Sequence, residues 1–93
     1  MDMQIKVKFT GHYKDLFGEE KDVEVASGAT LHDLANTMCT SKEYYQAIFD
    51  ESGRPKPGVG IEDRHGRKVK LLDSGDEKLS DKDEIIIFHF MAE

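Results

Sequence analysis

The stretch Glu84-Ile85-Ile86-Ile87-Phe88-His89-Phe90-Met91 contains the longest unbroken run of apolar residues in this 93-residue sequence. Isoleucine and phenylalanine favour extended backbone, because branched and aromatic side chains pack well on a pleated surface. Both alternating sets of positions are largely apolar, so both faces of the strand need cover. This pattern is typical of a central strand, and we expect the rest of a sheet to form around it.

Two segments near the start of the chain have the alternation of a half-buried strand. Apolar Ile5, Val7 and Phe9 are interleaved with polar residues, and a shorter alternation of the same kind covers residues 22–25. A period of two residues places one set of side chains in a core and the other set in solvent. We expect the first of these strands to pair in parallel with the last strand of the chain.

Helix signals follow the early strands. A short helical turn closed by Gly18 is expected over residues 12–18. Thr30 is placed to cap a longer helix, with Asp33 as a variant of the capping box, and Ser41 is placed to cap a second one. The expected apolar positions are Leu31, Leu34, Ala35 and Met38 in the first of these helices and Tyr44, Tyr45, Ile48 and Phe49 in the second.

The second half of the chain reads as a loop followed by strands. Residues 50–60 contain two prolines and three glycines, which predict a long loop. Arg64-His65-Gly66-Arg67 is predicted as a hairpin turn between strands at 59–61 and 69–72. The whole order predicts one α+β domain over residues 1–93, with a mixed sheet of about five strands over one main helix. That is the β-grasp arrangement.

The charge balance restricts the possible partners. The chain has 19 acidic and 13 basic residues and a net charge of −6, so nucleic acid is not expected as a ligand. The basic cluster Arg64, Arg67, Lys68 and Lys70 is interpreted as a solvated strand and turn. We expect no signal peptide and no membrane span. A cytoplasmic location is predicted, and the single cysteine, Cys39, fits a reducing compartment.

Three segments resemble a known family. They are the opening Ile5-Lys6-Val7-Lys8-Phe9 with Tyr13-Lys14-Asp15-Leu16-Phe17-Gly18, then Gly28-Ala29-Thr30-Leu31-His32-Asp33-Leu34, then Leu79-Ser80-Asp81-Lys82-Asp83-Glu84-Ile85. In order and spacing they are similar to the ubiquitin-like sulfur carriers of the molybdopterin synthase small subunit and thiamin pathways (MoaD and ThiS). The resemblance implies a β-grasp fold and, as a partner, a large synthase-type subunit or an activating enzyme.

The resemblance also implies chemistry at the end of the chain. In the family a flexible tail ends in Gly-Gly, and its carboxylate is adenylated and then converted to a thiocarboxylate. Here the corresponding residues are Met91, Ala92 and Glu93, without the glycines that let bare backbone enter a narrow channel. We therefore expect that this chain no longer donates sulfur. The alternative is a sulfur carrier in molybdopterin or related cofactor biosynthesis whose working chain is longer.

No catalytic or metal-binding set is recognisable in the sequence. The histidines His12, His32, His65 and His89 are scattered and have no metal-ligand spacing to a cysteine or carboxylate. Cys39 has no adjacent base and is expected to pack at a helix end. We predict no metal, no cofactor and no enzymatic activity, with at most a carrier subunit's role in an enzyme complex.

The last strand provides the candidate binding surface. If Ile85 and Ile87 join the core, the alternate side chains point to the opposite face of the sheet, which no helix covers in this fold. A row of large apolar side chains there indicates a protein-interaction surface for another protein or a second copy. Cover by the 50–60 loop is the alternative without a function. The predicted partner-binding residues are Ile86, Phe88, Phe90, Lys6 and Lys8.

Overall fold

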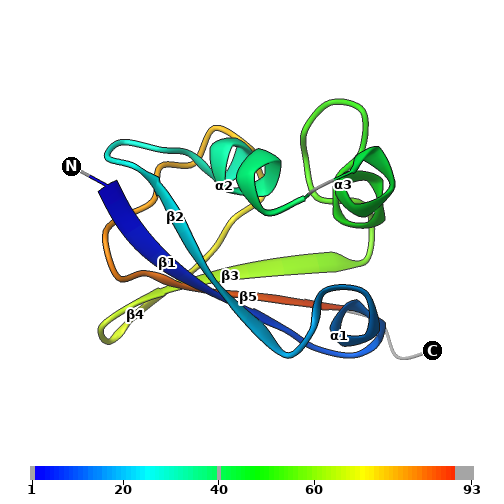
Figure 1. Ribbon diagram of the computed structural model, residues 1–93, viewed down its shortest axis with the longest axis horizontal. Coiled ribbons are helices and arrows are strands. Elements are labelled where there is room, and N and C mark those ends of the chain that lie inside the picture. Colours follow the sequence, from blue (N-terminus) through cyan, green and yellow to red (C-terminus); the bar gives the residue numbers. More distant parts are fainter. Residues whose placement is uncertain (1, 40, 90–93) are drawn as a thin grey trace.

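The computed structural model describes residues 2–39 and 41–89, in which five strands form one mixed sheet (Figure 1). The strands are β1 (Asp2–Phe9), β2 (Glu20–Ala26), β3 (Val59–His65), β4 (Lys68–Leu71) and β5 (Glu84–His89), in the order β2-β1-β5-β3-β4. β5 lies in the middle, parallel to β1 and antiparallel to β3. The central position and the parallel pairing predicted for this strand are both confirmed.

The described residues also form three helices, α1 (His12–Phe17), α2 (Leu31–Met38) and α3 (Lys42–Ile48). The Thr30 hydroxyl accepts a hydrogen bond from the Asp33 N–H (3.3 Å), and the Asp33 carboxylate accepts one from the Thr30 N–H (2.9 Å). This is the reciprocal capping box predicted for α2. Ser41 caps α3 by accepting from the Tyr44 N–H at 3.5 Å.

The core lies between the sheet and the pair α2 and α3, which Figure 1 shows on the same side of the sheet. The predicted stripe of α2 is buried in full. Ile85 is 0% exposed and Ile87 is 2% exposed, and in register they lie beside the buried Val7 and Phe9. The predicted division of β5 into a core set and an opposite set is therefore confirmed.

An aromatic cluster closes the end of the core beside α1. The rings of Phe9 and Phe17 stack with centroids 4.7 Å apart, and Phe17 meets Tyr44 of α3 at 5.3 Å. Tyr13 is also buried there. The short α1 is thus fixed by packing, since a helix of this length has little stability of its own.

The predicted hairpin turn was too wide. β3 continues through Arg64 to His65, and β4 starts at Lys68 rather than at residue 69, so only two residues form the turn. Gly66 has φ of 62°, a backbone conformation that suits a tight two-residue hairpin and costs glycine little. The polar character of Arg64 and His65 hid their place in the strand.

Within residues 2–39 and 41–89, no helix has the length and apolar character needed to cross a bilayer.

Candidate functional site

The face of the sheet turned away from α2 and α3, here called the outer face, contains the predicted site. Pairing in register aligns Lys8 of β1 with Ile86 of β5, Ile86 with Glu62 of β3, and Glu62 with Leu71 of β4. Because paired residues share a face, the sheet fixes the membership of this surface. The outer face includes Gln4, Lys6, Lys8, Glu20, Asp22, Glu24, Gly60, Glu62, Arg64, Val69, Leu71, Glu84, Ile86 and Phe88.

Ile86 and Phe88 lie on the outer face, as predicted, but both are half-buried rather than fully exposed. The Phe88 ring lies against Gly60, its partner in β3, since a Cβ at residue 60 would come within 2.5 Å of the ring Cζ. A glycine at this position therefore makes room for the aromatic side chain. The predicted Phe90 and the tail Met91, Ala92 and Glu93 lie outside the described residues.

Ion pairs flank the apolar centre of the outer face. Lys8 Nζ lies 2.7 Å from Glu84 Oε1, and Arg64 Nε lies 2.9 Å from Glu62 Oε2. The hydrogen bond and charge of Glu84 raise the pKa of Lys8, and the same contact lowers the pKa of Glu84. Lys8 is thus already paired with an acid of its own chain, whereas Lys6 is exposed and has no ion pair among the described residues.

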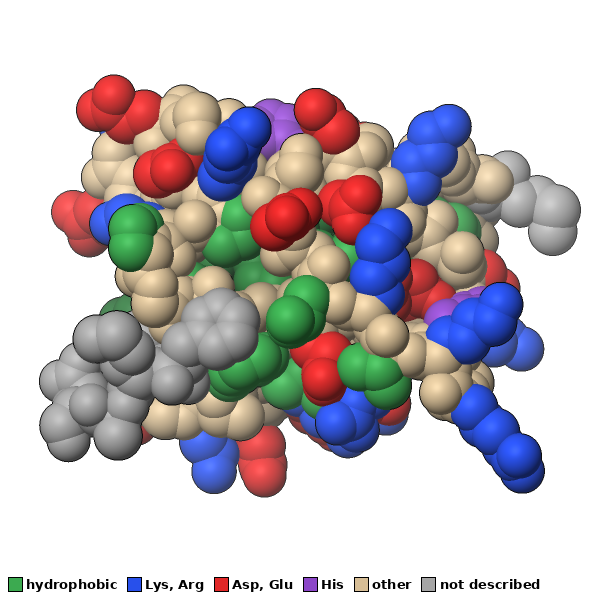
Figure 2. Space-filling model, turned by 180° about the vertical axis from the view of Figure 1, so that it is seen from behind, with side chains coloured by type: hydrophobic (Ala, Val, Ile, Leu, Met, Phe, Trp, Pro, Cys, Tyr) green, Lys and Arg blue, Asp and Glu red, His purple; other side chains and the backbone are tan. Residues whose placement is uncertain are grey.

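Two strongly exposed apolar side chains on β4 were not predicted as part of the site. Val69 is 57% exposed and Leu71 is 54% exposed, and both belong to the outer face. Figure 2 shows hydrophobic side chains gathered around a hollow on the rear of the molecule, with Lys and Arg side chains at the end near the β3–β4 hairpin. The alternation Lys68-Val69-Lys70-Leu71 contained the signal, but the edge position of the strand was needed to interpret it.

An apolar groove adjoins Leu71, with a volume of about 370 Å³. One wall contains Pro55 and Pro57, the floor contains Gly60 and Ile61, and Leu71, Leu72 and Asp73 lie on the other side. The wall is fixed in place, because the Asp50 carboxylate accepts hydrogen bonds from the Ser52 N–H (2.9 Å) and hydroxyl (2.7 Å) and from the Arg54 N–H (3.1 Å). The groove is therefore preformed.

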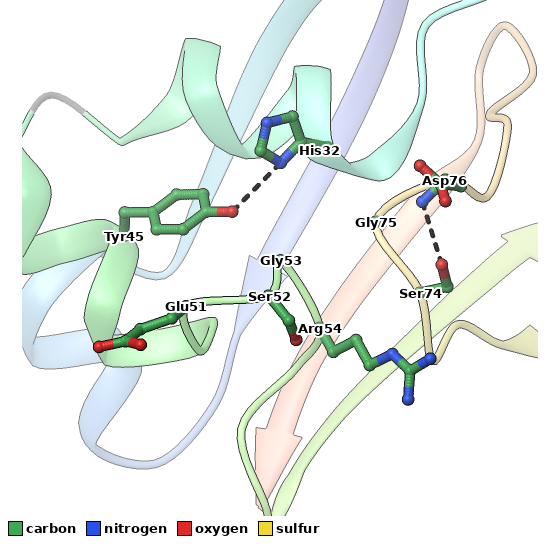
Figure 3. Close-up of a pocket in the computed structure, with 9 residues that line it drawn as sticks. All are labelled: His32, Tyr45, Glu51, Ser52, Gly53, Arg54, Ser74, Gly75 and Asp76. Atoms are coloured by element: carbon green, nitrogen blue, oxygen red, sulfur yellow. Dashed lines mark hydrogen bonds between the residues drawn. The ribbon is translucent and has the colours of Figure 1, made fainter.

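A second, polar pocket of about 630 Å³ lies between α2, α3 and two loops. Figure 3 shows His32 and Tyr45 facing each other and Arg54 extending toward Ser74. Tyr45 Oη lies 3.1 Å from His32 Nδ1, but burial raises the pKa of this phenol, so it is not poised as a base. The first amides of α2 are already bonded, Leu31 N–H to Glu77 O and His32 N–H to Gly75 O. The N-terminus of α2 therefore offers no open amide donors to an anion in this pocket.

A buried acid cluster lies on the core side of the sheet, near the hairpin. Asp83 is 2% exposed, and its carboxylate bonds to His65 Nδ1 (2.5 Å) and accepts from the Ser80 N–H (2.9 Å). Asp63 Oδ1 is buried without a hydrogen-bond donor among the described residues. Burial and the adjacent Asp83 raise the pKa of Asp63 to about 7. Folding is therefore coupled to the protonation of the Asp63 carboxyl.

The described residues do not assemble a catalytic set. No three His, Cys, Asp or Glu side chains within residues 2–39 and 41–89 come together as a metal site. Cys39 is half-buried at the end of α2, and burial raises the pKa of its thiol, which disfavours the nucleophilic thiolate. Binding is the chemistry that the outer face and its groove support.

Known structures share this fold. They include the HVO 2177 protein of Haloferax volcanii (TM-score 0.75, 20% identity, 98% of this chain and 86% of that chain) and SAMP1 of the same organism (0.71, 16%, 97% and 98%). A putative molybdopterin converting factor subunit 1 from Pyrococcus furiosus has a TM-score of 0.64 and 27% identity over 94% of this chain and 97% of that chain. No protein-family model matches the sequence, and no curated protein matches it significantly.

These similarities agree with the resemblance found in the sequence. One neighbour is named a small archaeal modifier protein and another a putative molybdopterin converting factor subunit. The fold predicted from the order of elements is therefore confirmed. The chain is a ubiquitin-like β-grasp protein, similar in structure to the small archaeal modifiers and to a MoaD-like subunit.

Proposed function

We propose that this protein is a small, non-catalytic interaction subunit that binds another protein through its outer face. The observation that supports the proposal is the apolar pair Ile86 and Phe88 at the centre of the sheet, on the face opposite α2 and α3. Val69 and Leu71 lie on the same face, beyond the Glu62–Arg64 ion pair. An apolar centre rimmed by charges is the usual composition of a protein interface. The ion pairs on both sides of Ile86 supply such a rim.

The geometry favours a partner that covers the centre of the sheet. Ile86 belongs to the central strand, and α1 borders this surface only at one end, where Lys14 and Ile86 line the same shallow cavity. The 50–60 loop packs instead against the end of α3, since the Lys56 N–H donates to the Ile48 carbonyl. Cover by that loop, the alternative weighed from the sequence, is therefore not supported at Ile86.

Photo-crosslinking followed by direct binding tests the proposal. A photoreactive amino acid at position 86 should capture the partner in native cells, whereas the same group at Glu24, on the acidic side of the outer face, should capture less. The captured protein is then purified, and its affinity is measured with the parent chain, with Ile86→Asp and with Leu16→Asp. Leu16 is an exposed apolar residue of α1 and serves as the matched control.

We expect Ile86→Asp to weaken binding at least about tenfold, as for a central interface residue, and Leu16→Asp to have little effect. Equal affinities of the two variants, both folded, would contradict an interface at Ile86.

A sulfur-carrier role is the second candidate, and the molybdopterin converting factor name of the Pyrococcus furiosus neighbour favours it. Such a role requires a thiocarboxylate at the end of the working chain. Intact mass of the protein purified from its native cell tests it directly. A population heavier by the replacement of one oxygen with sulfur, sensitive to alkylation, would establish the carrier. A single mass equal to that of the unmodified chain would leave only the interaction role.

A further inference from the structure

We infer that the outer edge of β4 and the adjoining apolar groove accept an extended segment of a partner protein, which adds to the sheet as a sixth strand and alternates apolar with acidic side chains. This surface is distinct from the centre of the outer face. Among residues 2–39 and 41–89, β4 is the last strand of the sheet and pairs only with β3. The edge of such a strand presents backbone groups that another strand can bond.

The hydrogen-bond phase of β4 identifies the groups that point outward. The Leu72 N–H donates to the Ile61 carbonyl at 2.8 Å, so residue 72 faces β3 with its backbone. In an antiparallel pair the hydrogen-bonded positions alternate along the strand. The backbone groups of Lys70 and Lys68 therefore also point toward β3. The backbone N–H and C=O groups of Val69 and Leu71 therefore point away from β3, toward the place of a sixth strand.

The side chains of β4 define what the added strand must contain. Val69 and Leu71 extend onto the outer face, where they are 57% and 54% exposed, and Lys68 and Lys70 extend onto the other face. A strand lying beside them matches this pattern when its apolar residues adjoin Val69 and Leu71 and its acids adjoin the lysines. The alternation of the partner is thus set by the alternation of β4.

The charge at this edge selects an acidic partner. Within a chain of net charge −6, the hairpin gathers four basic side chains, two of which are neutralised, Arg64 by Glu62 and Lys70 by Glu77 (3.0 Å). Arg67 and Lys68 have no ion pair among the described residues. The opposite edge strand, β2, instead presents Glu20, Asp22 and Glu24 on the outer face and would repel the same segment.

A second copy of the chain is disfavoured as the occupant. Antiparallel pairing of β4 with β4 of another molecule, through the outward groups of Val69 and Leu71, would set Lys68 or Lys70 of one copy opposite Lys70 of the other. Like charges directly across strands are destabilising. Lysines on an edge strand are a common device against such pairing. With an acidic segment, the same lysines would form favourable charge pairs across the strands instead of repelling.

The groove gives the added strand a place for a further apolar side chain. Leu71 belongs both to the exposed pair on β4 and to the lining of the groove, so the groove begins where that pair ends. Its volume of about 370 Å³ is within the range of small ligand pockets. Its Pro55 wall is fixed by the bonds to Asp50, so little ordering is needed on binding.

The test uses a short synthetic peptide that alternates valine or leucine with glutamate, titrated into the ¹⁵N-labelled protein and followed by NMR. We expect the largest amide shifts at Val69 and Leu71 and smaller ones at Gly60 and Ile61. Val69→Pro removes an outward N–H without removing a bond to β3, and should weaken binding about fivefold or more relative to Val69→Thr, which retains it.

Charge is tested with a matched pair. Lys68→Glu should weaken peptide binding severalfold, and more at low salt than at high salt, whereas Lys14→Glu on α1 should not. A peptide with lysine in place of glutamate should not bind. The centre of the outer face is not involved, so Ile86→Asp should leave peptide affinity within about twofold of the parent. That variant separates this inference from the proposed function.

Three results would overturn the inference. Amide shifts confined to β2 or to the centre of the outer face would place the peptide elsewhere. No shift up to the solubility limit of the peptide would remove the site. Concentration-dependent self-association abolished by Val69→Pro, measured by analytical ultracentrifugation, would assign the edge to a second copy.

Discussion

Two faces of one strand provide the most instructive comparison in this molecule. Ile85 and Ile87 of β5 are 0% and 2% exposed, whereas Ile86 and Phe88 between and beyond them are half-buried on the outer face. The residue types are nearly the same, so hydrophobicity does not separate the two sets. The packing of α2 and α3 against only one face separates them. An apolar residue on the uncovered face then gains full burial only by binding a partner.

Ile87→Asp and Ile86→Asp form the sharpest test of this comparison. Ile87→Asp should unfold the domain, because an unpaired carboxylate would be buried in the core, at a cost of about 5 kcal/mol or more. That is comparable with the whole stability of a small domain. Ile86→Asp should remain folded, with circular dichroism and NMR dispersion like the parent. An unfolded Ile86→Asp together with a folded Ile87→Asp would require a shift of the register by one residue.

Leu34→Ala tests the covered face from the helix side. Leu34 is 1% exposed in the middle of the α2 stripe, and truncation of such a residue should lower the free energy of unfolding by about 2–5 kcal/mol. Leu71→Ala is the matched change at an exposed leucine and should cost less than about 0.5 kcal/mol. Urea denaturation measures both. Similar losses for the two variants would show that α2 does not cover the sheet as described.

Gly60→Ala tests the contact that makes Phe88 half-buried. A Cβ at residue 60 would come within 2.5 Å of the Phe88 ring, so the ring has to move off the sheet. We expect a loss of about 1–3 kcal/mol, the usual cost of overpacking. Most of the loss should disappear in the Phe88→Leu background, where the ring is absent. An equal loss in both backgrounds would place the cost in the backbone of β3 instead.

The main strands and the main helix could be predicted from the sequence, because their local signals agree with the arrangement of the whole fold. The alternation of β1 and β5, the capping box at Thr30 and the stripe of α2 each predicted a structure that is present. Charged side chains inside a strand misled the prediction at Arg64 and His65. Sequence alone does not show that a strand-forming residue such as Arg64 remains paired up to a two-residue turn.

The candidate site was less predictable, because it depends on neighbours far apart in the chain. The alternation of β5 correctly assigned Ile86 and Phe88 to the outer face. Val69 and Leu71 were missed, since their exposure follows from the edge position of β4, which only the strand order reveals. The β3–β5 pairing brings Phe88 into contact with Gly60, which is 28 positions earlier in the sequence. No local pattern encodes it.

Asp63→Asn tests an exception on the core side of the sheet. Asp63 is paired in register with the fully buried Ile85, so a carboxylate lies where apolar residues are the rule. Burial, reinforced by the hydrogen bond and charge of Asp83, raises its pKa to about 7, while His65 and Lys70 oppose the shift. The unfolded chain has an aspartate pKa of about 3.9. Between these pH values the folded protein retains a proton that the unfolded chain has lost.

The sign of the pH effect follows from this difference in bound protons. The contribution of Asp63 to stability should fall as the pH rises from about 4 through about 7, because the unfolded state binds less of this proton over that interval. The amide side chain introduced by Asp63→Asn has no proton to lose, so this variant should gain stability relative to the parent at about pH 8 compared with about pH 5. Urea unfolding at the two pH values measures the difference. Asp15→Asn, at an exposed acid of α1, is the control and should not change the slope. A parent protein that is more stable at the higher pH, with the same slope in the Asp63→Asn variant, would show that Asp63 folds as an ordinary carboxylate.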